Sequence, residues 1–250
     1  MPSDVRAADG TAAERYKVPS VVLMENAARA AADAAEAMAR GDGPFVILAG
    51  HGNNGGDGFA AARHLMLRGH CVAVLKTAED GRYKNDAAVN LRIIRELEGA
   101  ELRIADSPSL DDREVKELLR GAAVVLDALL GTGTTGAPRG EAGRLIKLSA
   151  GCGNILALDI PSGIDPESGA CYEPCVRAAA TVAFLAPKKG MAFSPALEAC
   201  GRIITADIGV PASKVLPQAP ALSLYFEEDI KKLCSRRFRA RYTRPNAARC

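Results

Sequence analysis

Residues 50–58 hold the densest group of small and polar residues in this sequence. They read GHGNNGGDG and contain five glycines, two asparagines and one aspartate. The apolar run 45–49 precedes them and predicts a buried strand, and residues 59–69 have the composition of a helix. A strand, a glycine-rich turn and a helix together present backbone N–H groups and a helix N-terminus to a phosphate. A tight turn alone needs fewer polar side chains, so the pattern favours a binding site.

Further polar residues come at the ends of later apolar segments. Asp127 lies inside one of them, where a carboxylate costs several kcal/mol unless it is paired, hydrogen-bonded or bound to a cation. A second glycine-rich loop, GTGTTGAPRG, follows at 131–140. Asp159 and Ser162 come at the end of the next apolar segment, and Lys188 follows the one after that. Carboxylates in such positions can move protons or hold cations.

The elements that must position these residues alternate along the chain. Strands are predicted at residues 45–49, 70–76, 101–105, 122–130, 154–160, 180–185 and 202–208. Helices are predicted at residues 20–39, with Ser20 as N-cap, and at 59–69, 84–97, 111–120, 141–149 and 227–233, with a loop at 212–224. This alternation predicts an α/β sandwich with a mostly parallel sheet and right-handed crossovers.

Ligands of such sheets bind at the carboxyl ends of the strands, beside a topological switch point. The polar groups of four segments should therefore meet at one edge of the sheet and form one pocket. They are Asn53, Asn54 and Asp57 after the first strand, the loop at 131–140, Asp159 with Ser162, and Lys188.

Composition narrows the class of protein. Of the 250 residues 48% are hydrophobic but only 4% aromatic, so small aliphatic side chains must build the core of one large domain. No apolar run approaches the roughly 20 residues of a membrane helix, and the first residues lack the layout of a secretory signal. Seven scattered cysteines, of which only Cys171 and Cys175 are close, indicate free thiols in the cytoplasm rather than a zinc site.

Charge is distributed unevenly. The last 21 residues hold eight basic and no acidic residues, while the rest of the chain is mildly acidic. We expect a domain at residues 1–230 followed by a basic C-terminal tail or linker at 231–250.

Six motifs of this sequence resemble those of a known protein family. They are LMENAA at 23–28, GHGNNGGDGFAAARHL at 50–65, DALLGTG at 127–133, LDIPSGID at 158–165, FLAPKKG at 184–190 and ADIGVP at 206–211. In this order they resemble the YjeF N-terminal domain family, the NAD(P)HX epimerases, over roughly residues 11–230. The resemblance implies a Rossmann-like three-layer α/β/α sandwich that is usually a homodimer.

It also implies an isomerase of metabolite repair. Hydration of NADH or NADPH gives NADHX or NADPHX with R and S epimers at C6, and the family interconverts the two. A separate ADP- or ATP-dependent dehydratase, specific for the S epimer, then completes the nicotinamide nucleotide repair. The chains of many bacterial members of the family continue into that dehydratase. A stand-alone epimerase and one half of a bifunctional protein are therefore both compatible with the sequence. Compared with the family pattern, we expect the chain to begin about ten residues late.

The resemblance assigns roles by matching position. Substrate contacts would come from Asn53, Asn54, Gly55, Gly56, Asp57, Gly131, Thr132, Gly133, Thr134, Thr135, Gly136, Ala137 and Asp159. One potassium ion per subunit would lie among Asn54, Asp127 and Ser162. Amide, hydroxyl and carboxylate oxygens suit that ion. For the proton transfer, Asp127 is the first candidate and Asp159 the second, and Lys188 would act on the substrate electrostatically.

Lys17 and Ala28 depart from the family pattern, because both stand where glycine is frequent. Two other classes of function make different demands on the sequence. An NAD-dependent oxidoreductase should end its second strand with an acidic residue, and Lys76 stands there. A non-catalytic scaffold or RNA-associated protein could use the basic tail, with Phe238 and Tyr242 stacking on bases. Such a protein should have lost the loop and ion-site residues, so nucleic acid is not the expected ligand.

Overall fold

The computed structural model describes residues 11–216. The chain divides into two units, Met1–Pro217 and Gln218–Cys250. The predicted helix at 227–233, the predicted domain boundary at residue 230 and the basic tail therefore lie outside the described residues.

One seven-stranded sheet forms the centre of the described fold, with the strand order β3-β2-β1-β4-β5-β6-β7. Its strands are β1 (Phe45–Ala49), β2 (Val72–Lys76), β3 (Leu102–Asp106), β4 (Val124–Ala128), β5 (Ile155–Leu158), β6 (Ala180–Phe184) and β7 (Arg202–Ala206). Every neighbouring pair of these strands is parallel. The predicted α/β class and parallel sheet are confirmed.

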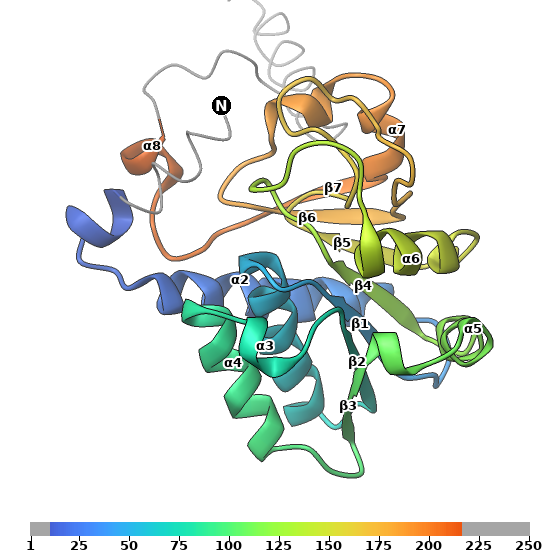
Figure 1. Ribbon diagram of the computed structural model, residues 1–250. Coiled ribbons are helices and arrows are strands. Elements are labelled where there is room, and N and C mark those ends of the chain that lie inside the picture. The colour runs from blue at the N-terminus through green and yellow to red at the C-terminus, as the bar shows by residue number, and fades with distance from the viewer. Residues whose placement is uncertain (1–10, 217–250) are drawn as a thin grey trace, which may run out of the picture. The chain divides into compact units, whose positions relative to one another are not determined.

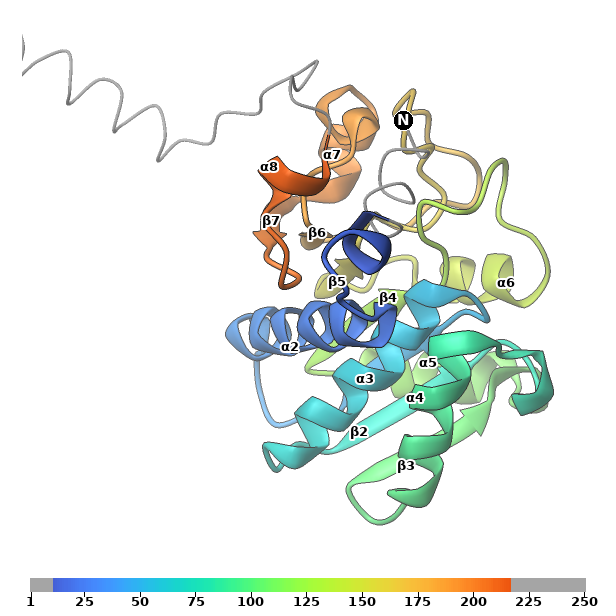
Figure 2. The ribbon, with the colours of Figure 1, turned by 90° about the vertical axis from the view of Figure 1, so that its left-hand side faces the viewer.

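Helices cover both faces of this sheet (Figure 1). They are α2 (Ser20–Met38), α3 (Asn53–Leu67), α4 (Asn85–Glu96), α5 (Asp112–Arg120), α6 (Gly140–Ser149), α7 (Ala196–Cys200) and α8 (Ala212–Val215). Single 3₁₀ turns are η1 (Asp80–Arg82), η2 (Ser107–Ser109) and η3 (Lys189–Ala192). One buried apolar cluster lies under α2, α3 and α4, and a second lies under α5 and α6. Figure 2 shows the first of these helical layers facing the viewer.

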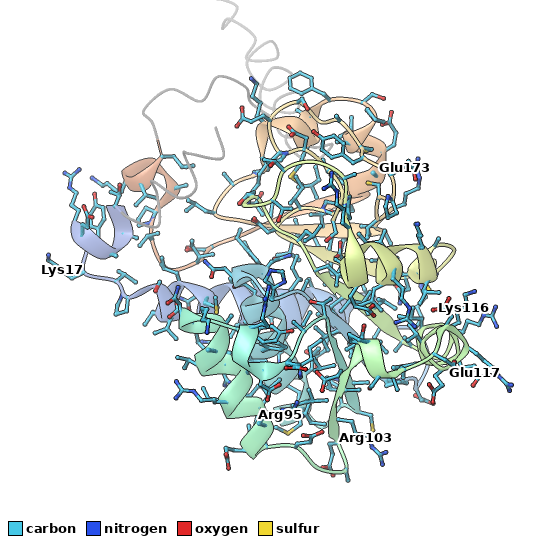
Figure 3. All side chains as sticks on the ribbon, viewed as in Figure 1. Lys17, Arg95, Arg103, Lys116, Glu117 and Glu173 are labelled. Carbon is cyan, nitrogen blue, oxygen red and sulfur yellow. The ribbon has the colours of Figure 1, made fainter. Side chains whose placement is uncertain are left out.

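Alanine lets α2 pack closely within this layer. Ala28, Ala31 and Ala35 are fully buried along one side of the helix. Methyl side chains leave little space between helices, which explains how a chain with few aromatic residues still builds a core. Charged side chains occupy the outside, and Figure 3 labels Arg103 and Lys116 among them. Within residues 11–216, no helix has both the length and the apolar character needed to cross a membrane.

The start of α3 differs from the prediction. We expected a turn up to residue 58, but the helix begins at Asn53, directly after the extended N-cap Gly52. Glycine has low helix propensity, which is why composition placed this boundary too late. Packing overrides propensity here: a Cβ at Gly55 would lie 1.8 Å from the carbonyl oxygen of Gly50, and one at Gly58 would lie 2.7 Å from the Ala128 Cβ. These two glycines bring α3 close to the sheet.

A Gly55→Ala variant is expected to lower the free energy of unfolding by about 3 kcal/mol, because the added methyl group meets a backbone carbonyl that cannot move aside. Gly52→Ala is the control, since no heavy atom lies within 4 Å of a Cβ at that position. Urea denaturation of both variants measures the difference. Equal midpoints would contradict the packing role of Gly55.

Smaller differences concern the ends of elements. The other predicted strands and helices within residues 11–216 agree with the structure to within two residues. Ser20 is the first residue of α2 rather than its N-cap, which is Pro19. Residues 212–215, predicted as loop, form α8. Lys17 adopts a φ of 59°, in the left-handed region that favours glycine, which gives a reason for the glycine expected there.

Candidate active site

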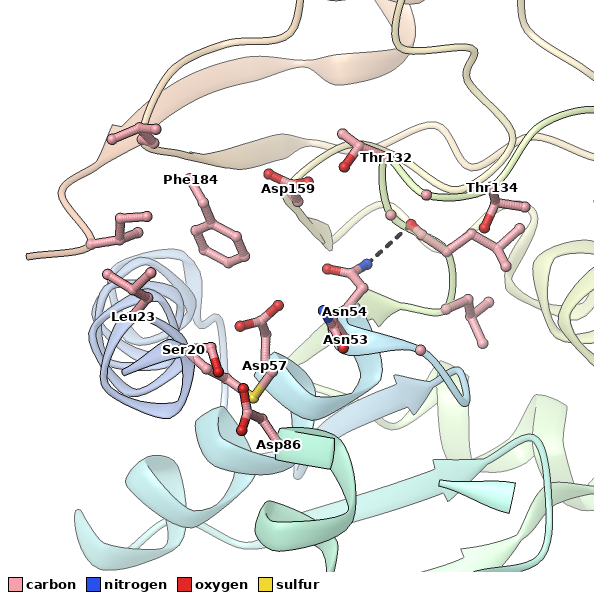
Figure 4. A pocket seen from close by; sticks show the side chains of 18 of the residues that line it. Ser20, Leu23, Asn53, Asn54, Asp57, Asp86, Thr132, Thr134, Asp159 and Phe184 are labelled. Carbon is pink, nitrogen blue, oxygen red and sulfur yellow. Dashed lines mark hydrogen bonds between the residues drawn. The ribbon is translucent and has the colours of Figure 1, made fainter. Parts of the chain in front are cut away.

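The sheet reverses its strand order between β1 and β4, and two adjoining cavities open at the carboxyl ends of the strands there. The first, here called the main cavity, has a volume of about 430 Å³. In Figure 4, Asn54 and Asp57 lie on one side of it and face Asp159 and Thr132 on the other. The second cavity, of about 570 Å³, shares His51 and Thr134 with the main one.

The structure brings most of the sequence-predicted residues to these cavities. Asn53, Asn54, Asp57, Gly131, Thr132, Gly133, Thr134 and Asp159 line the main cavity. Thr134, Thr135, Gly136 and Ala137 line the second cavity. Gly55 and Gly56 are buried in the packing of α3 and line neither of the two. Asp127, Ser162 and Lys188 are also outside both linings.

Asp127 is fully buried in β4, and its carboxylate is held by hydrogen bonds. Oδ2 accepts from the backbone N–H of Ser162 at 2.8 Å, and Oδ1 accepts from the Ser162 hydroxyl at 2.7 Å. The Leu129 N–H donates to Oδ1 at 3.2 Å. Burial raises the pKa of the Asp127 carboxyl to about 6, although these hydrogen bonds act in the opposite direction. Asp127 has no exposed surface and does not line the main cavity.

Asn54 connects this buried group with the main cavity. Its amide Nδ2 donates to the carbonyl oxygen of Leu130 at 3.0 Å, the dashed line in Figure 4. The Leu130 N–H in turn donates to the Ser162 hydroxyl at 2.9 Å. The amide oxygen Oδ1 of Asn54 is buried, and no group in the described part of the chain donates a hydrogen bond to it. An orphaned amide oxygen, a hydroxyl and a carboxylate are the donor set that a cation such as potassium takes, so these residues fit that ion.

Asp159 lies directly after β5 with a φ of 68°, in the left-handed region, and its backbone N–H donates to the Val182 carbonyl at 2.8 Å. Its carboxylate forms an ion pair with Lys188, whose ammonium also donates to the carbonyl oxygens of Phe184 at 3.0 Å and Ala186 at 3.2 Å. Both residues are buried. Lys188 therefore stands behind Asp159 and holds its carboxylate at the cavity wall.

Replacing Lys188 with methionine is expected to lower the free energy of unfolding by about 3–5 kcal/mol, because the Asp159 carboxylate would lose its buried partner. Lys189→Met is the matched control, since the neighbouring Lys189 is exposed. Thermal unfolding followed by circular dichroism compares the two variants. If they unfold at the same temperature, the ion pair does not stabilise the fold.

Sequence reasoning missed one wall of the main cavity. Leu23 and Met24 of α2, Asp86 at the start of α4 and Phe184 at the end of β6 all line it. The first two belong to the LMENAA motif, which was the available signal. Asn26 of the same motif donates to the Ile208 carbonyl at 3.0 Å, so it fastens α2 to the segment after β7.

The main cavity is acidic. Asp57, Asp86 and Asp159 line it, and no lysine or arginine of residues 11–216 does.

The five cysteines of residues 11–216 are free thiols, as predicted.

A parallel sheet of this order, with a cavity at its switch point, defines a doubly wound α/β protein, the class whose ligands bind at the carboxyl ends of the strands. Residues 20–190 match the family described as YjeF-related protein N-terminus. The chain belongs to this family.

Named relatives agree with this assignment. A protein of Rhodopirellula baltica named NAD(P)H-hydrate epimerase is 36% identical over 208 residues, which are 83% of this chain and 82% of that protein. One of the same name from Clavibacter sepedonicus is 37% identical, over 86% of this chain and 96% of its own length. The bifunctional NAD(P)H-hydrate repair enzyme Nnr of Thermanaerovibrio acidaminovorans is 46% identical over 87% of this chain, which spans only 42% of that relative.

A solved structure shows the same fold. The crystal structure of the yeast protein ynu0 superimposes with a TM-score of 0.64 and covers 81% of this chain and 84% of its own. The sequence identity is 22%, so this likeness speaks for the fold alone.

Proposed function

We propose that this protein is an NAD(P)H-hydrate epimerase, which interconverts the R and S epimers of hydrated NADH and NADPH. The observation that carries the proposal is the acidic main cavity, in which Asp159 faces Asn54 and Asp57. Two relatives that match over most of their own length bear the name of this activity.

Inversion at C6 can proceed by loss and return of water. A proton transferred to the C6 hydroxyl lets water leave, and the ring nitrogen stabilises the cation that remains. Water then adds to either face of the ring and gives up a proton. Asp159 is the carboxyl group that gives and takes this proton, because it lies at the cavity wall and Asp127 does not. Asp57 and Asp86 add negative charge around the developing cation.

A potassium ion would be held by Asn54, Asp127 and Ser162. When bound, the ion would supply positive charge that offsets the buried Asp127 carboxylate, and the unpaired Oδ1 of Asn54 would coordinate it. Asn54 then keeps its neighbour Asn53 in place at the cavity wall.

The partners proposed are hydrated NADH or NADPH, an ADP- or ATP-dependent dehydratase and a second copy of the chain. Bifunctional repair enzymes among the relatives support the link with a dehydratase. The homodimer and the cytoplasmic location stay predictions. No observation on residues 11–216 favours the scaffold or RNA-associated alternative.

The test is direct. Purified protein mixed with (R)-NADHX or (R)-NADPHX should convert it to the S epimer faster than the spontaneous reaction, as followed by chromatographic separation of the epimers. No acceleration for either compound, together with retention of RNA at moderate salt, would overturn the proposal in favour of the scaffold alternative.

A further inference from the structure

The second cavity carries the charge opposite to that of the main one. Arg82 of η1 and Arg139 before α6 both line it. Among residues 11–216 neither guanidinium takes part in an ion pair or a side-chain hydrogen bond. Glu141 also lines this cavity, but Arg144 pairs with its carboxylate at 2.7 Å. Two positive charges in the second cavity therefore lack a counter-charge.

The start of α6 adds to this positive field. Arg139 is the N-cap of this ten-residue helix, and its side chain makes no capping hydrogen bond. The first residues of α6, Gly140 to Ala142, line the cavity, no side chain caps their N–H groups, and a helix N-terminus attracts anions.

The two cavities lie next to each other, as two sites for the two halves of a dinucleotide would. They share His51, Leu129, Leu130 and Thr134. If the nicotinamide half occupies the acidic main cavity, the diphosphate passes this shared wall, and the adenosine half enters the second cavity.

The end of β2 indicates which adenosine half fits. In dinucleotide-binding sheets a carboxylate near this strand end accepts from the ribose 2′-hydroxyl, whereas an arginine nearby accommodates a 2′-phosphate. Here β2 ends in Lys76, which is buried and pairs with Asp80 at 2.7 Å and with Asp106. The two carboxylates near this strand end, Asp80 of η1 and Asp106 at the end of β3, are thereby engaged, and Arg82 of η1 lines the cavity instead.

We propose that the second cavity binds an adenosine 2′-phosphate, held by Arg82 and Arg139, so that the protein prefers phosphorylated dinucleotides. This inference rests on the proposed function and extends it, since it assigns hydrated NADPH as the favoured substrate over hydrated NADH.

A binding experiment tests the site without any turnover. Titration calorimetry of the full chain with adenosine 2′,5′-bisphosphate and with adenosine 5′-monophosphate should show the bisphosphate binding at least about tenfold more tightly, as charge-assisted hydrogen bonds predict. An Arg82→Ala/Arg139→Ala double variant should lose that difference. Arg103→Ala, at an exposed arginine of β3, is the control and should keep it. Equal affinities of the wild-type chain for the two compounds would overturn the site.

Kinetics separate this inference from the proposed function. The double variant should lower the ratio of kcat/KM for NADPHX to that for NADHX by about tenfold. A protein that epimerises both compounds with an unchanged ratio refutes the 2′-phosphate site alone. A protein that discriminates the two adenosine compounds but epimerises neither refutes the proposed activity alone.

Discussion

An Asp159→Asn variant is expected to lose epimerisation by a factor of about 10²–10⁴ in kcat, the range that general acid–base catalysis contributes. Asparagine keeps the shape of the side chain but cannot act as a general acid or base toward the C6 hydroxyl. Asp159 is the carboxylate for which the geometry gives both access to the main cavity and a cation behind it, in Lys188. The rate of approach to epimer equilibrium, starting from pure (R)-NADPHX, measures the loss.

Two controls make this result interpretable. Asp207→Asn changes an exposed carboxylate after β7 and should keep the wild-type rate. Binding of NADP⁺ to the Asp159→Asn variant should persist, which shows that the cavity is still formed. Wild-type turnover by Asp159→Asn would assign the proton transfer to another group, with Asp57 as the next carboxylate on the cavity wall.

The positions of the strands could be predicted from the sequence because each is a short apolar run between polar segments. The strand ends also predicted which polar residues meet, and Asn53, Asp57 and Asp159 do line one cavity. Hydrophobic pattern and the geometry of parallel sheets are sufficient for this level of description.

Side-chain direction could not be predicted in the same way. All five residues of β4 are buried, so no alternation of exposed and buried positions marks where Asp127 points. The sequence ranked Asp127 ahead of Asp159 as the proton-moving group. In the structure hydrogen bonds enclose Asp127 and it does not line the main cavity, which is why we propose Asp159 first. Lys188, which was expected to act on a substrate electrostatically, forms a buried ion pair with Asp159, and its effect on a substrate stays a prediction.

Short elements escaped prediction for a related reason. The turn η1 has three residues, too few for a periodic pattern, yet it brings Arg82 to the second cavity. The division of the loop 131–137 between two cavities likewise depends on tertiary packing.

Potassium is expected to raise the unfolding temperature of the wild-type chain, and an Asp127→Asn variant is expected to lose this response. An ion that binds only the folded state at 100 times its Kd stabilises it by about 2.7 kcal/mol. For a chain of this size that is a shift of about 5–10 °C. The reason lies in the buried oxygens: Asn54 Oδ1 has no partner among the described residues, and Asp127 has no counter-charge there.

The measurement compares unfolding temperatures in potassium chloride and in choline chloride at equal ionic strength. Because each variant is compared with itself, any change in its baseline stability cancels. Asn54→Leu should also lose the response, since it removes the orphaned oxygen and keeps a side chain of similar size. Asp207→Asn should retain it, because its carboxylate is exposed and lies outside the main cavity lining. A potassium response that survives in both Asp127→Asn and Asn54→Leu would place the ion elsewhere, and its absence from the wild-type chain would remove the ion site from the proposal.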